Sequence, residues 1–261
     1  MATHLSRYFI SCGMKCRGVY SPTYVHAGNL AEQLDADTFE SVEQLWSRVR
    51  EEIIPIVLIA VKDDALKSVG GTLPRGLDRT LVLHTSGSTP MAVLSRAAHY
   101  GVLYPLQTFS HHRQVDIKEV HFYVESSDAD AERILQELVS ELSLHYVTPC
   151  TSEQRGYVHL SAVFACNFVN HMYARGEAIL ERAGLDPSAL NPLMQETLSK
   201  ALEFPPATVQ TGPAVRGDRT TMDRHLDLLK DYPTDADLYR RISQAIYENA
   251  HSKELKDEQN Q

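Results

Sequence analysis

Apolar residues in the first half of the chain follow two alternating patterns, one typical of buried strands and one of helices. Residues 53–60 are apolar almost throughout, as a strand covered on both faces would be. Residues 81–83 and 101–103 form two further short apolar runs. Strands that alternate with helices usually lie parallel in one sheet. The first half is therefore predicted to be an α/β domain.

Helical spacing and turn residues place the other elements of this half. Helices are expected at residues 1–11, 25–34, 42–49 and 128–142. Additional strands are expected at residues 14–20, 119–124 and 145–147. A dinucleotide-binding fold normally places a glycine-rich turn between its first strand and first helix. No G-x-G-x-x-G pattern occurs in the chain, and Gly70-Gly71 is expected in a loop after a different strand.

The second half has a different pattern, which is helical throughout. Residues 153–183 read as one long helix that Gly184 would cap, and Pro187 stands where helices often begin. Further helices are expected at residues 187–203, 220–230 and 235–251, followed by a frayed polar tail at 252–261. We therefore predict an α/β domain at residues 1–149 and an all-α domain at residues 150–261.

Composition narrows the possible partners and the cellular compartment. The net charge is −9 and the basic residues are scattered, which argues against nucleic-acid binding. No segment has the ~20 apolar residues of a membrane span, and no signal peptide is recognisable. The four cysteines show neither a zinc pattern nor a redox C-x-x-C motif. Free thiols in a cytoplasmic protein are expected.

Two polar loops follow neighbouring apolar runs and are candidates for a binding site. They are His84-Thr85-Ser86-Gly87-Ser88 and Tyr104-Pro105-Leu106-Gln107-Thr108-Phe109. The carboxyl ends of parallel strands open into the same crevice, where such sheets bind ligands. Ser86 and Gln107 would then face a substrate. The alternative is that Ser-Gly and Tyr-Pro only form turns.

The long helix at residues 153–183 carries the best candidate for chemistry. His159 and Asn170 are eleven residues apart, which puts them on one face of an α-helix, and Asn167 lies about 80° away. His159 or Asn170 could orient a substrate carbonyl or relay its proton, and Asn167 could contact the substrate. The alternative is a hydrogen-bond network that attaches the helix to the first domain.

The loop at residues 211–218 is a second candidate for substrate binding. Arg216 could clamp a carboxylate or phosphate, and Asp218 could cap the next helix. An internal Arg216–Asp218 ion pair is the alternative. His111, His112 and His121 lack the spacing of a metal site on one element, so no metal is predicted.

Several long strings resemble a known family and match it in the same order along the chain. They are His84-Thr85-Ser86-Gly87, Tyr104–Phe109 (YPLQTF), residues 159–171 (HLSAVFACNFVNH) and residues 211–218 (TGPAVRGD). The chain resembles Rossmann-like proteins provisionally described as NADP oxidoreductases, which carry a helical C-terminal domain of unknown function. More distantly it is similar to pyrroline-5-carboxylate reductase, deazaflavin-dependent NADP reductases and β-hydroxyacid dehydrogenases.

The resemblance implies a Rossmann-like domain followed by a helical domain of the 6-phosphogluconate-dehydrogenase-like type. Such proteins carry a strand and a Gly-x-Gly-Asn-type turn ahead of the position of Met1, so the first strand is missing here. Similar two-domain reductases pair through their helical domains, which implies a homodimer. A small-molecule substrate would bind in the cleft between the domains.

The end of the second strand of the usual fold indicates the type of cofactor. NAD-preferring enzymes place an acidic residue there to bind the ribose, whereas this chain has Tyr20-Ser21-Pro22-Thr23. The hydroxyls of Ser21 and Thr23 can donate to a 2′-phosphate, so NADP is favoured over NAD. Lys62 could hold a phosphate or carboxylate as a point charge. Further expected cofactor contacts are Ala60, Val61, His84 and Thr85.

Two functions of different classes follow. The first is an NADP-dependent oxidoreductase that moves hydride between the nicotinamide and a small carbonyl or imine, with Ser86, His159 and Asn170 positioning the substrate. The second is a non-catalytic nucleotide or metabolite sensor that keeps the Rossmann-like shell. The missing glycine-rich turn favours the sensor, and the polar helix face favours the enzyme.

Overall fold

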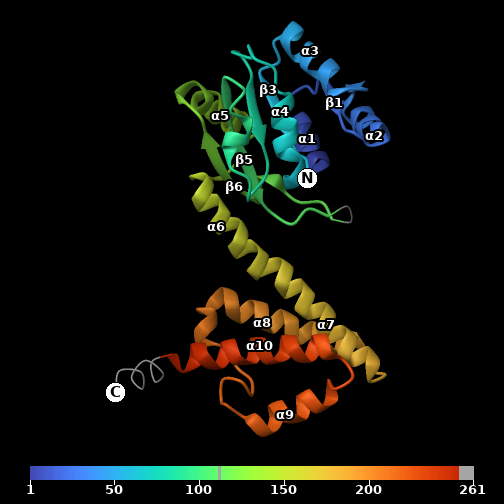
Figure 1. Ribbon diagram of the computed structural model, residues 1–261, viewed down its shortest axis with the longest axis vertical. Helices are drawn as coiled ribbons and strands as arrows, with labels where there is room; N and C mark the ends of the chain where they lie inside the picture. The colour runs from blue at the N-terminus through green and yellow to red at the C-terminus, as the bar shows by residue number, and fades with distance from the viewer. Residues whose placement is uncertain (111–112, 253–261) are drawn as a thin grey trace. The chain divides into compact units, whose positions relative to one another are not determined.

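The structure is a computed structural model that describes residues 1–110 and 113–252 (Figure 1). It divides into two compact units, Met1–Asn167 and Phe168–Gln261. The division falls within a long helical stretch rather than near Pro149. The expected boundary between residues 149 and 150 stays a prediction.

A five-stranded sheet forms the centre of the N-terminal unit, in the order β3-β4-β5-β6-β7. The strands are β3 (Ile56–Ile59), β4 (Leu81–His84), β5 (His99–Leu106), β6 (His121–Ser126) and β7 (Tyr146–Pro149). All neighbours pair in parallel except β5 and β6, which are antiparallel. The helices α4 (Asp63–Thr72) and α5 (Ala129–Glu141) connect its strands, with short 3₁₀ turns at Met91–Leu94 and Ile117–Glu119. The α/β architecture expected from the sequence is confirmed.

A separate two-stranded parallel sheet lies in the same unit. It consists of β1 (Gly18–Tyr20) and β2 (Asp37–Phe39), and the accompanying helices are α1 (Ala2–Ser11), α2 (Tyr24–Leu34) and α3 (Val42–Glu52). A strand was expected at residues 14–20, and the observed strand β1 covers only the last three residues of that range. The sequence analysis missed β2, because three residues are too few to show an alternating pattern.

Burial on β4 alternates between two cores, one on each face of the five-stranded sheet. Leu81 and Leu83 pack with α1 and α5 on one face, where Phe122 is also fully buried. Val82 points to the other face and packs with Trp46 of α3 and with α4. Because β4 is covered on both faces, it needs apolar residues at every position. His84, the last residue of the strand, is the exception.

Side-chain caps fix where several helices of this unit begin. Asp128 accepts hydrogen bonds from the amides of Asp130 and Ala131, and Ser41 accepts one from Gln44, as N-caps do. Gly70 and Gly71 lie inside α4, so the prediction of a loop at these residues is wrong. At Gly70 a side chain would collide with the Val93 carbonyl oxygen, which explains the glycine as a close-packing position.

The helix that leaves the sheet contains a wide turn that the sequence analysis did not predict. It starts as α6 (Ser152–Ala162), continues as a π-helical turn (Val163–Phe168) and ends as α7 (Val169–Arg182). Thr151 and Gln154 form a capping box at its start. A π-turn has more residues per turn than an α-helix. The regular spacing that placed Asn170 on the face of His159 therefore does not hold across it.

The C-terminal unit is helical, as expected. It contains α7 and then α8 (Asn191–Glu203), α9 (Arg219–Leu228) and α10 (Pro233–Ala250), with short 3₁₀ turns at Pro187–Leu190 and Pro206–Thr208. Gly184 has a φ of 71° and ends α7 with the left-handed conformation that favours glycine. The carboxylate of Asp235 joins α10 to α7 through Arg175 (2.7 Å) and Arg182 (2.8 Å).

Two of the expected absences concern membranes and disulfides. Within the described residues, no helix is both long and apolar enough to cross a membrane. Cys12, Cys16, Cys150 and Cys166 are free cysteines, which confirms the expected thiols. His111, His112 and most of the predicted polar tail lie outside the described residues.

Candidate functional site

The loop after β4 is almost completely buried at the carboxyl end of the strand. His84, Thr85 and Ser86 are 0%, 3% and 6% exposed. The Ser86 hydroxyl accepts hydrogen bonds from the amides of Ser88 (3.2 Å) and Thr89 (2.9 Å) and donates to the Thr89 hydroxyl (3.0 Å). Ser86 therefore shapes the turn, and its hydroxyl is already engaged within the loop.

His84 is held in its neutral form inside this loop. Its Nδ1 accepts a hydrogen bond from the Ser86 amide at 3.1 Å, so the ring proton lies on Nε2. Burial, and after it the nearby positive charge of Arg155, lower the pKa of His84 to about 4. The residue is thus a structural anchor for the loop near neutral pH.

Arg155 of α6 fastens the loop to the sheet and was missed by the sequence analysis. Its side chain is fully buried and donates to the carbonyl oxygens of Ser86 (3.1 Å) and Thr89 (2.6 Å). It also forms an ion pair with Glu125 of β6, whose carboxylate accepts from the Ser152 amide at 2.8 Å. An arginine so close to a helix N-terminus opposes the helix dipole, and that position was the available signal of a specific partner.

Tyr104 and His159 form a hydrogen-bonded pair beside Gly87. The Tyr104 hydroxyl lies 3.2 Å from His159 Nδ1, and the two rings meet edge to face. A side chain at Gly87 would lie only 2.7 Å from the Tyr104 ring and 2.8 Å from His159 Nδ1. Only glycine fits between them, and this fit brings β4, β5 and α6 together at one point.

The pair can hold and transfer a proton. Burial raises the pKa of the Tyr104 phenol, and the negative charge of Asp63 raises it further. Asp63, the first residue of α4, accepts a hydrogen bond from the Ser88 hydroxyl at 2.5 Å. A neutral phenol bonded to a half-buried imidazole is a suitable general acid. Tyr104 lies within β5 rather than in a turn, which corrects the turn interpretation of Tyr104-Pro105.

The other predicted site residues of the N-terminal unit lie at more exposed positions. Ser21 is half-buried, Thr23 is exposed, and the Ser21 hydroxyl accepts from the Thr23 amide at 3.3 Å. Ala60 is half-buried, whereas Val61 and Lys62 are exposed after β3. The exposed side chains of Gln107 and Asn167 complete this group.

The remaining candidates belong to the C-terminal unit. Asn170 and Arg216 are exposed there. Asp218 caps α9 by accepting from the Thr221 amide at 3.1 Å, as the sequence predicts. Of the predicted residues, the structure thus brings together His84, Thr85, Ser86 and His159.

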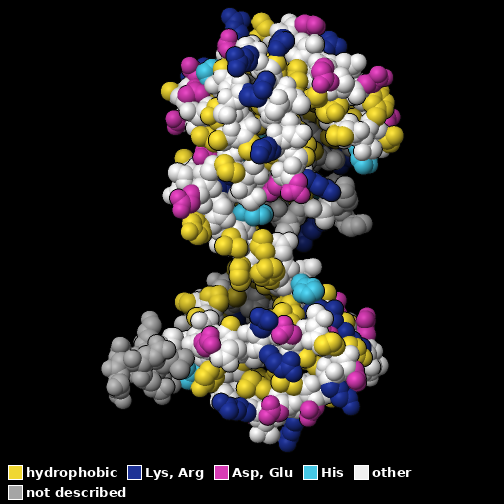
Figure 2. Space-filling view, viewed as in Figure 1, with side chains coloured by type: hydrophobic (Ala, Val, Ile, Leu, Met, Phe, Trp, Pro, Cys, Tyr) yellow, Lys and Arg dark blue, Asp and Glu magenta, His cyan; other side chains and the backbone are white. Residues whose placement is uncertain are grey.

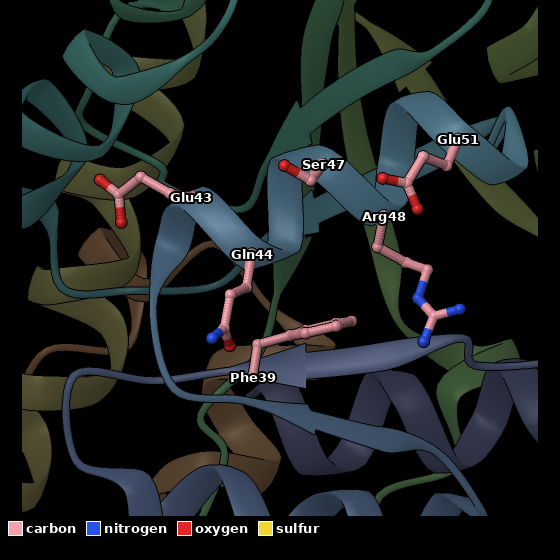
Figure 3. Close-up of a pocket in the computed structure, with 6 residues that line it drawn as sticks. All are labelled: Phe39, Glu43, Gln44, Ser47, Arg48 and Glu51. Atoms are coloured by element: carbon pink, nitrogen blue, oxygen red, sulfur yellow. The ribbon is translucent and has the colours of Figure 1, made fainter.

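Two other features lie away from this site. A surface hollow of about 520 Å³ lies between Phe39 and the outer face of α3 (Figure 3), and its Arg48 is paired with Asp37 and Glu52. His99, Asp128 and Asp130 form the one cluster with metal-ligand spacing among the described residues. His99 starts β5, and Asp128 already caps α5 and bonds His99 at 2.9 Å.

Comparison with known proteins identifies the fold and the family. A Bacteroides fragilis protein, BF3122, described provisionally as an NADP oxidoreductase, is 36% identical; the match covers 95% of this chain and 94% of that one, with a TM-score of 0.80. A reductive aminase from Aspergillus terreus, solved with NADPH and ethyl-5-oxohexanoate, is 13% identical over 97% and 91% of the two chains, with a TM-score of 0.70.

A pyrroline-5-carboxylate reductase from Coxiella burnetii is 15% identical over 96% and 94% of the chains, with a TM-score of 0.50. The domain of unknown function DUF2520 matches residues 120–246. No curated protein matches the chain in sequence.

The fold and these similarities define a class: an α/β sheet domain followed by a helical region, as in the Rossmann and 6-phosphogluconate-dehydrogenase-type reductases. Within that class the chain belongs to the family of BF3122, with a DUF2520 domain. The resemblance stated from the sequence is confirmed.

Proposed function

We propose that the protein is an NADP-dependent oxidoreductase that transfers hydride between the nicotinamide and a small carbonyl or imine substrate. The observation that carries this proposal is the Tyr104–His159 hydrogen bond beside Gly87, at the carboxyl end of β4. Ligands of open α/β sheets bind outside the carboxyl ends of the strands. The family relative described as an NADP oxidoreductase supports the same class.

Residues that follow three of the strands could bind different parts of the cofactor. Ser21 and Thr23 follow β1 and offer hydroxyls to a 2′-phosphate without an acidic neighbour in the segment Tyr20–Tyr24. Ala60, Val61 and Lys62 follow β3, where the exposed ammonium can face a phosphate. The backbone of His84 and Thr85 follows β4. The residues that hold a pyrophosphate in this fold normally come from a glycine-rich turn, which the described residues do not supply.

The chain's own residues would manage the proton. The nicotinamide, when bound, supplies or accepts the hydride. Tyr104 would hold a proton on its oxygen for the substrate oxygen or nitrogen, and His159 Nδ1 would exchange that proton with it. Gly87 would keep the pair aligned, and the buried loop beneath it would exclude water from one side. The expected contributions of Asn167, Asn170, Gln107 and Arg216 to substrate binding stay predictions.

Calorimetric titration of NADPH and of NADH into the protein tests cofactor choice. We expect tighter binding of NADPH, because the segment Tyr20–Tyr24 carries no acidic residue of the kind that binds the ribose of NAD. Equal or tighter binding of NADH would overturn the preference.

NADPH oxidation with a panel of small ketones, with and without amines, tests catalysis. Tyr104→Phe should lower the rate by about 10²–10⁴-fold, as loss of a general acid does. Tyr146→Phe, on β7 of the same sheet, is the matched control and should keep the rate, because Tyr146 is 50% exposed. Equal rates for the two variants would remove Tyr104 from the mechanism. NADPH binding without turnover of any substrate would favour the sensor.

We also propose that the protein is a homodimer built on the helical unit. Large apolar side chains are exposed there within the single chain, including Leu193 (62%), Leu198 (56%), Leu202 (80%) and Leu228 (78%). A second copy could cover them with a self-complementary interface, burying at least ~1,200 Å² in total. Light scattering behind a sizing column tests this proposal, and a concentration-independent monomer mass would overturn it.

A further inference from the structure

A second hollow lies at the amino ends of β3 and β4, whereas the candidate functional site lies at the carboxyl end of β4. The hollow has a volume of about 310 Å³ and lies between the end of α3 and the loop that leads from α4 to β4 (residues 73–80). The Thr80 hydroxyl joins the two walls by donating to the Ile54 carbonyl oxygen at 2.7 Å. Its lining residues are not shared with the hollow in Figure 3.

The floor of this hollow is apolar and belongs to the core of the N-terminal unit. Val49 and Leu77 line the hollow but are only 2% and 3% exposed, and both pack in the cluster that contains Trp46. Ile53 adds an exposed apolar side chain to one wall. Thr80 is buried, and its hydroxyl is already hydrogen-bonded. These side chains suit an apolar group of a ligand and offer it no free hydrogen-bonding group.

Two arginines line the same hollow, and neither forms an ion pair with another described residue. The Arg50 guanidinium makes one long hydrogen bond, to the Arg75 carbonyl oxygen at 3.4 Å. The side chain of Arg79 has no hydrogen-bond partner in the part of the chain that the structure describes. Asp78 also lines the hollow, yet it forms no ion pair with either guanidinium. Both positive charges are therefore available to a ligand.

The pairing of other arginines in this unit shows what Arg50 and Arg79 lack. Several of them have carboxylate partners, namely Arg17 and Arg48 with Glu52, Arg133 with Glu137, and Arg155 with Glu125. Arg50 also offsets the partial negative charge at the carboxyl end of α3, but Arg79 is on the opposite wall and has no such role. The planar forks of two guanidiniums suit the oxygens of a carboxylate or phosphate. An apolar floor beside them therefore fits a ligand with an apolar body and an anionic head.

We propose that this hollow binds a small organic anion, with its carboxylate or phosphate between Arg50 and Arg79 and its apolar body on Val49 and Leu77. The four residues of β4 separate the hollow from the buried loop of the candidate functional site, which corresponds to ~13 Å along a strand. The anion would therefore be a ligand in addition to cofactor and substrate, and the inference does not depend on the proposed activity. Because it binds the folded unit, the anion would also stabilise that unit.

Calorimetric titration of phenyl phosphate into the full chain tests the proposal. We expect saturable binding, and an affinity lower by about tenfold or more in the double variant Arg50→Gln/Arg79→Gln, because charge-assisted hydrogen bonds are lost. The matched control Arg7→Gln/Arg133→Gln removes the same charge from α1 and α5 and should bind as the wild type does. All four arginines are exposed, so both double variants should fold. Thermal midpoints followed by Trp46 fluorescence should rise with phenyl phosphate in the wild type and the control only.

Two further probes separate the anionic head from the apolar body. Benzyl alcohol, which has the ring without the charge, and inorganic phosphate, which has the charge without the ring, should each bind about tenfold or more weakly than phenyl phosphate. No binding of phenyl phosphate, equal affinity of the two double variants, or equal binding of benzyl alcohol would overturn the arginine site. Equal binding of inorganic phosphate would overturn the role of the apolar floor. Displacement of phenyl phosphate by NADPH would place the probe in the cofactor site and overturn the separate location.

Discussion

The two units of the molecule bury apolar surface to very different extents. In the N-terminal unit, Leu81, Leu83, Leu103 and Phe122 are fully buried around one sheet. In the described part of the C-terminal unit, the buried hydrophobic residues are Ala214, Leu229 and Ala236. Figure 2 also shows hydrophobic side chains on the surface along α6 and the π-helical turn that follows it, where Tyr157, Leu160 and Phe164 are more than half exposed.

This difference indicates which unit can be stable without a partner. The N-terminal unit has a large sheet with a core on each face. The C-terminal helices bury few large apolar side chains within their own unit, so less apolar burial offsets the conformational entropy of ordering them. We therefore predict that their stability depends on surfaces outside the unit, whereas that of the sheet depends on internal contacts.

The largest internal effect is expected from Arg155→Met. This substitution leaves the Glu125 carboxylate without its ion-pair partner in a nearly buried position, which typically costs about 3–5 kcal/mol. Urea unfolding followed by Trp46 fluorescence should report the loss in the N-terminal unit. Exchange of amides in α8 and α10 should remain unchanged.

Arg133→Met is the control, because the exposed pairs of Arg133 on α5 contribute about 1 kcal/mol or less. The double substitution Arg155→Met/Glu125→Leu should regain part of the lost stability by removing the unpaired charge. An Arg155→Met protein as stable as the Arg133→Met protein would contradict the role of this ion pair.

Alanine substitution of one buried and one exposed leucine tests the difference in apolar burial between the two units directly. Leu83→Ala should destabilise the N-terminal unit by about 3 kcal/mol at every protein concentration, because the residue is fully buried. Leu202→Ala should cost little in a monomer, since Leu202 is 80% exposed. If a second copy covers the C-terminal unit, the cost of Leu202→Ala should instead appear as weaker association, measured by light scattering over a dilution series.

Acid should weaken the N-terminal unit through His84. Folding keeps this imidazole neutral with a pKa of about 4, whereas in the unfolded chain its pKa is near 6.5. The unfolded state therefore binds more protons between these values. The contribution of the neutral imidazole to stability is complete above about pH 6.5 and is lost as the pH falls toward 4, by about 3 kcal/mol.

His84→Asn should remove this part of the pH dependence, because its side-chain oxygen can still accept from the Ser86 amide. His145→Asn is the control, since the His145 side chain is 54% exposed. Urea midpoints measured across this range by Trp46 fluorescence provide the comparison. Equal slopes for wild type and His84→Asn would show that another group controls the acid response.

Sequence pattern predicted most of the fold because local and tertiary preferences agree there. The apolar runs in β3, β4 and β5 and the cap at Asp218 carry strong signals. β2 was missed because its three residues have no periodicity. The π-helical turn was missed because no local motif marks the extra residue, and the Asn170 alignment depended on an uninterrupted α-helix.

The candidate site was only partly predictable for a different reason. His159 and Ser86 stand out because polar residues interrupt apolar patterns. Tyr104 and Arg155 act through partners that are distant in sequence, and a buried arginine resembles a surface one until its partner Glu125 is known. Helix-dipole reasoning could have singled out Arg155, but only the tertiary structure pairs Tyr104 with His159.

β3 is the outermost strand on one side of the five-stranded sheet, and its apolar edge bears on how the protein behaves in concentrated solution. A net charge of −9 at pH 7 keeps molecules apart by mutual repulsion. Near the isoelectric point of about 5.7 that repulsion disappears, and the apolar edges of different molecules can meet and pair. Solubility should therefore pass through a minimum in mildly acidic buffer, with aggregates rich in intermolecular β-structure. Purification and crystallisation would accordingly favour alkaline conditions.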